Sequence, residues 1–164
     1  MVLSYTNEVD QGFKTRMAWW YFKLNNVKLK IRQDPWLDFM LCWMIFDAYL
    51  TEISQSGSDR DKLDYFYQNR SDFKDRILKK WNSLSGYALT FKELSPIQDM
   101  RPNSNGMIYL NDENSLEQTF DFVYQIRCNL FHGAKDMKND RDAELVSRGA
   151  QFLRFCIDRW MKGD

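Results

Sequence analysis

The residues with the clearest chemical potential are an arginine and a histidine five positions apart. Arg127 and His132 lie in the segment IRCNLFHG (126–133), and His132 is the single histidine of the chain. Imidazole exchanges a proton near neutral pH, and guanidinium binds a phosphate group in a bidentate manner at any pH. The pair therefore suits phosphate-ester chemistry, with Arg127 on the phosphate and His132 handling the proton.

Three further residues are candidates for supporting this pair or binding a substrate: Asp47, Cys128 and Asn129. Asp47 interrupts a nearly all-apolar stretch, where a carboxylate must be paired or neutralised because burying a lone charge is very costly. Arg127 is its candidate partner. Asp121 and Glu117, which precede Arg127 on the same predicted helix, are the alternative partners for the guanidinium.

Other roles are open for the residues of this segment. Cys128 and His132, four positions apart, form a possible nucleophile and base, although no oxyanion-stabilising loop is recognisable beside them. His132 by itself is also typical of a helix C-terminus, where the macrodipole favours a cation. Phe131 directly precedes His132 in the sequence, so its ring is a candidate for stacking on a nucleic-acid base near the site.

The sequence predicts neither a metal site nor a cofactor. Its three cysteines, Cys42, Cys128 and Cys156, are far apart and odd in number, which fits a reducing compartment rather than a disulfide framework. No CxxC or HxxxH spacing is present.

Composition predicts one globular domain spanning residues 1–164. The chain is 44% apolar and 16% aromatic, and its 23 basic residues balance 23 acidic ones. A zero formal charge excludes binding to nucleic acid or anionic lipid through the overall field of the protein. No signal peptide is recognisable, and the most apolar window, 39–46, is too short to cross a bilayer. We therefore expect a soluble, cytoplasmic protein with no membrane partner.

Apolar periodicity predicts an all-α bundle of five to six helices. The first covers about 9–31, with Phe13, Met17 and Trp20 on its buried face. Asp34 and Pro35 supply an N-cap and a first-turn proline for the second, about 35–54, which is apolar nearly all round and therefore central.

The rest of the chain predicts shorter helices and one long connection. Two short helical patterns follow residue 58 and end near Gly86. The segment 87–114 loses periodicity, so it either hides short elements around 89–94 and 107–110 or works as a lid or binding loop. Ser115 and Gln118 form a capping box that opens a helix ending at Gly133. Asn139 and Asp140 open the last helix.

These features together resemble the HEPN superfamily over most of the chain. Arg127 and His132 match its R-x4–6-H signature at the end of a late helix, and WMIFDAY (43–49) resembles the W-x-x-F-N-A-x-Y stretch on the family's central helix. An Asp-rich turn, NDRD (139–142), then leads into a final amphipathic helix, as in relatives.

The resemblance implies a metal-independent endoribonuclease. In such enzymes the ribose 2′-hydroxyl attacks the adjacent phosphorus, a base takes its proton, and an acid protonates the leaving 5′-oxygen. Arg127 and His132 lie about 140° apart around an ideal helix, and one histidine cannot be base and acid together. A two-fold homodimer would bring two copies of each residue to one composite cleft. RNA is then the substrate, and an antitoxin or regulatory protein a further partner, as for toxin–antitoxin and phage-defence proteins.

Two positions differ from the residues common in active relatives. Cys128 follows the motif arginine where Asn, Asp or His is usual, with Asn129 displaced by one position, and Asp47 replaces an Asn. The alternative function is therefore a catalytically silent HEPN module that binds a nucleotide or protein, or only dimerises.

Overall fold

The second helix forms as its end signals predict. In this computed structural model, which describes residues 10–26, 34–101, 103–131 and 139–162, α2 spans Pro35–Ser54. The Asp34 carboxylate caps it by accepting hydrogen bonds from the backbone N–H of Trp36 (3.0 Å) and Leu37 (3.3 Å). Gln55 ends the helix in the left-handed conformation, with φ 55°.

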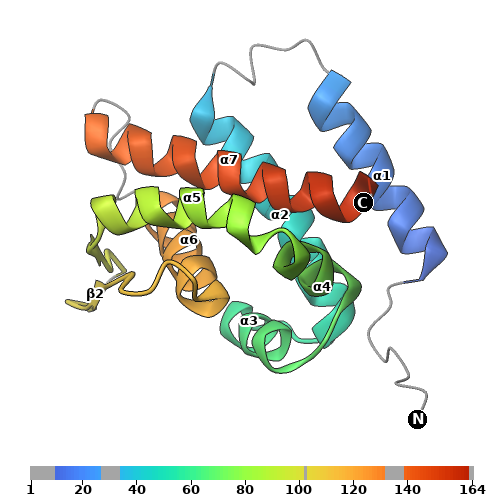
Figure 1. The fold of residues 1–164 in the computed structure, drawn as a ribbon, viewed down its shortest axis with the longest axis horizontal. Helices are drawn as coiled ribbons and strands as arrows, with labels where there is room; N and C mark the ends of the chain where they lie inside the picture. The colour runs from blue at the N-terminus through green and yellow to red at the C-terminus, as the bar shows by residue number, and fades with distance from the viewer. Residues whose placement is uncertain (1–9, 27–33, 102, 132–138, 163–164) are drawn as a thin grey trace.

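α2 is the centre of the bundle, as its nearly continuous apolar sequence requires (Figure 1). α7 (Asp140–Lys162) packs against it, while α1 (Gln11–Asn26) lies at one edge. The α1 prediction needs one correction. Trp20 is 48% exposed, because Phe13, Met17 and Tyr21, at spacings of four, form the face of α1 that packs on the core. Residues 27–31 of the predicted first helix lie outside the described residues.

Three helices occupy the stretch where two were predicted: α3 (Asp59–Gln68), α4 (Asp72–Lys79) and α5 (Trp81–Leu94). The described residues therefore contain seven helices, rather than five or six, in one all-α domain. Gly86 does not end a helix. α5 continues through it because Leu84, Ala88 and Phe91, at helical spacing, are all buried.

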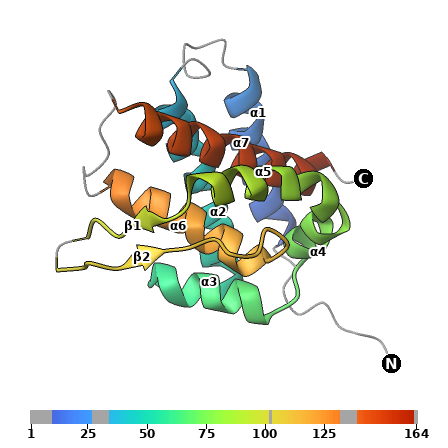
Figure 2. The same cartoon turned by 60° about the vertical axis from the view of Figure 1, so that its left-hand side comes forward.

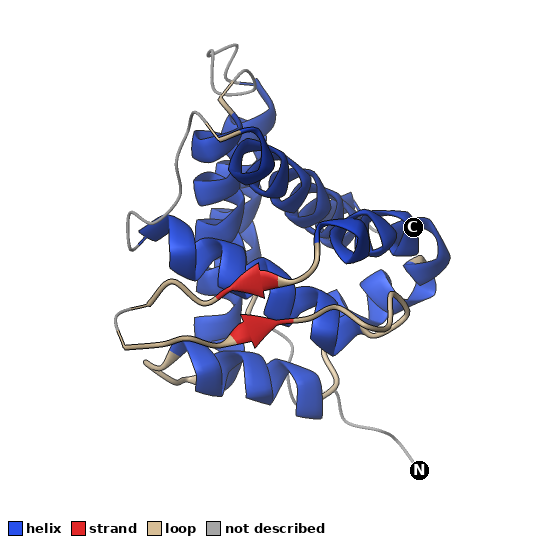
Figure 3. Ribbon diagram, turned by 90° about the vertical axis from the view of Figure 1, so that its left-hand side faces the viewer, coloured by secondary structure: helices blue, strands red, loops and turns tan. Residues whose placement is uncertain are grey.

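The segment 87–114 contains short elements of secondary structure, as the first of the two predicted alternatives requires. After α5 the chain forms a small hairpin of β1 (Ile97–Gln98) and β2 (Met107–Ile108), with Ile97 opposite Ile108 in antiparallel register. The hairpin lies beside α6 (Leu116–Phe131) at one side of the bundle (Figures 2 and 3).

The two late helices begin where predicted, with one change in capping. Ser115 Oγ accepts a hydrogen bond from Gln118 N (3.2 Å), but Gln118 Oε1 accepts from Asn111 N (2.9 Å) and Asp112 N (3.1 Å) rather than closing the capping box. The side chain of Gln118 thus ties the preceding loop to α6. Asn139 Oδ1 caps α7 through Arg141 N and Asp142 N.

An aromatic cluster joins the helices at the core. The Phe46 ring lies within 5.0–5.7 Å of four other rings, contributed by α2, α3, α4 and α6: Trp43, Phe66, Phe73 and Phe120. Offset and edge-to-face contacts of this kind add to the burial of the rings themselves. The cluster holds α6 in a fixed position against α2, and Arg127 follows on the same helix.

Gly149 sets the distance between α7 and α2. A Cβ atom at this position would lie 2.6 Å from Cε2 of Phe39, which is fully buried. We expect Gly149→Ala to lower the free energy of unfolding by about 1–3 kcal/mol, because a packed core resists overfilling. Gly86→Ala is the matched control: its Cβ meets nothing within 4 Å, so it should stabilise α5 by about 0.5–1 kcal/mol. Urea denaturation measures both, and equal effects of the two variants would contradict the packing argument.

Candidate active site

Arg127 lies near the C-terminal end of α6, where the sequence placed it. Its side chain is 23% exposed, so the guanidinium is held by the protein yet reaches the surface. Its partner in the motif, His132, follows Phe131 directly in the sequence. Both His132 and Gly133 lie outside the described residues.

Three side chains surround the Arg127 guanidinium. Its Nη1 atom lies 3.0 Å from Oδ2 of Asp59, in the first turn of α3. The guanidinium carbon lies 4.7 Å from the ring centre of Phe131 and 5.9 Å from that of Trp43. Cation–π contacts with two rings and one ion pair restrict the orientation of the guanidinium. Phe131 is 48% exposed, so much of its ring remains open to solvent.

Two buried donors beside this cation lack acceptors within the described part of the chain. They are Nε of Arg127 and Nε1 of Trp43. Asp59 uses one terminal nitrogen of the guanidinium, so Arg127 is not saturated by its ion pair.

The predicted pairing of Arg127 with Asp47 is wrong. Asp47 Oδ1 instead accepts a hydrogen bond from Lys62 Nζ at 2.9 Å, because Lys62, on α3, projects into the contact between α2 and α3 and is itself buried. Lys62 Nζ also lies 3.5 Å from Oδ1 of Asp59. Asp47 and Arg127 therefore belong to one ionic cluster, joined through Lys62 and Asp59.

The alternative carboxylates on α6 are not the partners of Arg127 either. Asp121 is bonded to Arg60 Nη1 (2.9 Å) and to the Tyr67 hydroxyl (2.9 Å), both from α3. Among the described side chains, the ion pair of Arg127 is with Asp59. The sequence did not predict Asp59 as a partner of Arg127, because no sequence pattern indicates which residues of a neighbouring helix lie close to α6.

Cys128 points into the protein. It is only 2% exposed, whereas reactive cysteines are partly accessible. Burial and a hydrogen bond with the Cys128 thiol raise the pKa of Tyr124, one turn earlier on α6. The burial of Cys128 weighs against its interpretation as a nucleophile.

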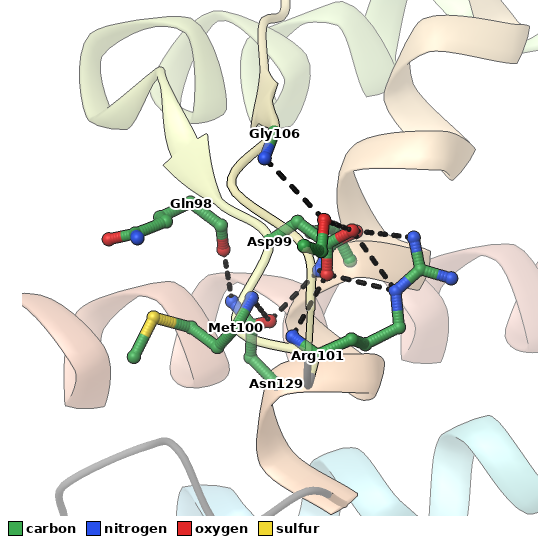
Figure 4. A network of polar contacts seen from close by, with 8 residues as sticks. Gln98, Asp99, Met100, Arg101, Gly106 and Asn129 are labelled. Atoms are coloured by element: carbon green, nitrogen blue, oxygen red, sulfur yellow. Dashed lines mark hydrogen bonds and ion pairs between the residues drawn. The ribbon is translucent and has the colours of Figure 1, made fainter.

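Asn129 is fully buried and holds the hairpin against α6 (Figure 4). Its Nδ2 donates to Gln98 O (2.7 Å), and its Oδ1 accepts from Met100 N (3.0 Å) and Gln125 Nε2 (2.9 Å). The side-chain amide thus binds one backbone carbonyl and one backbone N–H at the end of β1. These hydrogen bonds support the fold next to Arg127.

A buried carboxylate completes this network, and sequence reasoning missed it. Asp99 is 3% exposed and binds Arg101 through both oxygens, the shortest contact being 2.6 Å. It also accepts hydrogen bonds from Ser104 Oγ (2.6 Å) and Gln125 Nε2 (3.1 Å). The turn-rich sequence around it indicated a loop, and only tertiary contacts bury its carboxylate.

Asp99 makes stability depend on pH. The Arg101 guanidinium, above all, holds the pKa of the Asp99 carboxyl well below its usual range. A carboxyl whose pKa is lower in the folded state contributes stability at neutral pH and loses it as pH falls through and below about 4. We expect the difference in unfolding free energy between wild type and Asp99→Asn to shrink between pH 7 and pH 3, as measured by urea titration. Asp64→Asn, on exposed α3 surface, is the control. A difference that stays constant with pH would contradict this origin.

Within the described residues, no three His, Cys, Asp or Glu side chains are grouped to hold a metal ion. None of the helices described is both long and apolar enough to span a bilayer.

The fold and the cluster around Arg127 define an all-α single-domain protein with a partly exposed arginine at a helix end. Comparison with protein-family models, curated proteins and solved structures found no match to this chain.

Proposed function

We propose that the protein is a HEPN-type, metal-independent endoribonuclease whose site is completed at a homodimer interface. The observation that carries the proposal is the placement of Arg127. Its guanidinium contacts two aromatic rings near the end of α6, is partly exposed, and precedes the single histidine by five residues. A cation fixed in this way suits a phosphate group next to a residue that exchanges protons.

The reaction is an internal transfer of the phosphoryl group. One His132 takes the proton of the ribose 2′-hydroxyl, whose oxygen then attacks the adjacent phosphorus. Arg127 offsets the charge that develops on the phosphoryl oxygens. The second His132 of the dimer protonates the 5′-oxygen as its bond to phosphorus breaks. The products are a 2′,3′-cyclic phosphate and a free 5′-hydroxyl, with no net consumption of protons.

The biological setting follows from the same proposal. A cytoplasmic ribonuclease that cleaves cellular or phage RNA arrests growth, so it acts as a toxin or a defence effector. Such a protein needs restraint, which an antitoxin or regulatory protein would supply.

A second function is favoured by a specific observation. Arg127 is neutralised by Asp59, and the Asn129 side chain is hydrogen-bonded to the hairpin. An arginine already paired and an asparagine already bonded fit a catalytically silent module that binds a nucleotide or protein, or only dimerises.

The test is cleavage of a mixed RNA pool by the purified wild-type protein in EDTA. The ribonuclease proposal expects cleavage that leaves 2′,3′-cyclic phosphate ends, together with a dimeric mass in solution by light scattering. An inert wild-type protein would support the silent module. A strictly monomeric but fully active protein would overturn the composite site.

A further inference from the structure

We propose that Asp59 is a resident carboxylate that occupies Arg127 until an RNA phosphate displaces it, and that Lys62 retains Asp59 when this happens. This inference rests on the proposed function, in which Arg127 binds the scissile phosphate. It assigns Asp59 a role in tuning the affinity of the site.

The geometry provides two cations for one carboxylate. Asp59 Oδ2 lies 3.0 Å from Arg127 Nη1, while its Oδ1 lies 3.5 Å from Lys62 Nζ. Lys62 is anchored by Asp47 at 2.9 Å, and its side chain is only 8% exposed. The carboxylate can therefore leave Arg127 without losing all of its ionic contacts.

The position of Asp59 on its helix favours the released state as well. Asp59 is the first residue of α3, after the N-cap Ser58. A carboxylate in a first helical turn is stabilised by the unpaired N–H groups and the helix dipole. Both the dipole and Lys62 therefore stabilise the Asp59 carboxylate once a phosphate has taken its place at Arg127.

The charge balance explains why displacement is required. Arg127 and Lys62 contribute two positive charges, and Asp47 and Asp59 contribute two negative charges, so the cluster is neutral. A neutral cluster has no excess of positive charge to attract a phosphate. Arg127 and Asp59 are each about a quarter exposed, at 23% and 24%, so a competing anion from solvent can reach their ion pair.

Removing the competing charge should therefore tighten binding to RNA. The probe is a fluorescein-labelled 12-nucleotide RNA carrying 2′-methoxy groups, which cannot be cleaved, and binding is followed by anisotropy at several salt concentrations. We expect Asp59→Asn to lower Kd by about 2- to 5-fold relative to its control, the range that a partly exposed ion pair accounts for.

Asp64→Asn is the matched control. Asp64 lies on the same helix, and the substitution makes the same change in net charge. It also removes one carboxylate from an arginine, Arg60, which keeps its contact with Asp121. A gain for Asp59→Asn that exceeds the gain for Asp64→Asn, and that disappears when Arg127→Gln is added, supports the exchange. Equal gains, a gain that survives Arg127→Gln, or weaker binding by Asp59→Asn would overturn it.

A second measurement separates this inference from the proposed function. Inorganic phosphate is titrated into wild type and Asp59→Asn while the ¹⁵N resonance of Arg127 Nε is followed by NMR. Tighter phosphate binding at Arg127 in the variant supports exchange even if RNA is neither bound nor cleaved, in which case the ribonuclease proposal alone fails. An Arg127 resonance that responds equally in both proteins overturns the exchange, whatever RNA does.

Discussion

Arg127→Gln is expected to reduce the rate of RNA cleavage in EDTA by about 10²–10³-fold, the usual cost of losing a group that stabilises charge in the transition state. Glutamine keeps much of the side-chain length but cannot offset the charge on the phosphoryl oxygens. The stability of the fold should change by less than about 1 kcal/mol, because the lost ion pair with Asp59 is partly exposed. Gel assays of cleavage and thermal melting, run side by side, measure the two effects.

Arg148→Gln is the control for the loss of a positive charge, since Arg148 lies on α7 and pairs with Glu144 of the same helix. The single variant His132→Ala should also be inactive, as Arg127→Gln is. Mixing the two inactive variants should not restore the activity, because a mixed dimer keeps a single His132, whereas the proposed reaction uses one His132 as the base and the other as the acid. If Arg127→Gln melts several degrees lower and wild type does not cleave RNA, Arg127 is a structural residue.

Asn129→Ala is expected to lower the free energy of unfolding by about 2–4 kcal/mol, because it leaves several buried polar groups without partners. The groups affected are the carbonyl of Gln98, the N–H of Met100 and the amide of Gln125. Truncation at this position releases the hairpin from α6. Chemical denaturation of the wild type and the variant measures the loss.

Asn114→Ala provides the comparison, since Asn114 is exposed in the loop before α6 and its substitution should stay within about 0.5 kcal/mol of wild type. The two roles considered for Asn129 give opposite results. A variant with unchanged stability but weaker RNA binding would assign Asn129 to the substrate. A destabilised variant whose folded fraction keeps full activity would confine it to the support of the fold.

The features that could be predicted depend on residues close together in the sequence. The start of α2 at Asp34 and Pro35 and the start of α7 after Asn139 are set by hydrogen bonds spanning two or three residues. The all-α class follows in the same way from apolar residues repeated at spacings of three and four. The helical spacing of Leu84, Ala88 and Phe91 also indicates α5, although Gly86 suggested that the helix ends there.

The sequence also sufficed to single out Arg127, because the spacing of one arginine from the only histidine does not depend on the fold. Its surroundings could not be obtained in this way. The ion pair with Asp59 joins residues 68 positions apart in the sequence, and the hydrogen bonds from Asn129 to the hairpin span about thirty positions. An ion pair of Arg127 with Asp47, Asp121 or Glu117 was equally compatible with the residue types.

Tertiary structure alone decided which carboxylate reaches Arg127, which polar groups are buried, and how α3 and the hairpin lie against α6. The physical reason is that helix signals act within one turn, whereas charges and amides select partners by distance in space. That distance is set only when the aromatic core fixes how α2, α3 and α6 pack together.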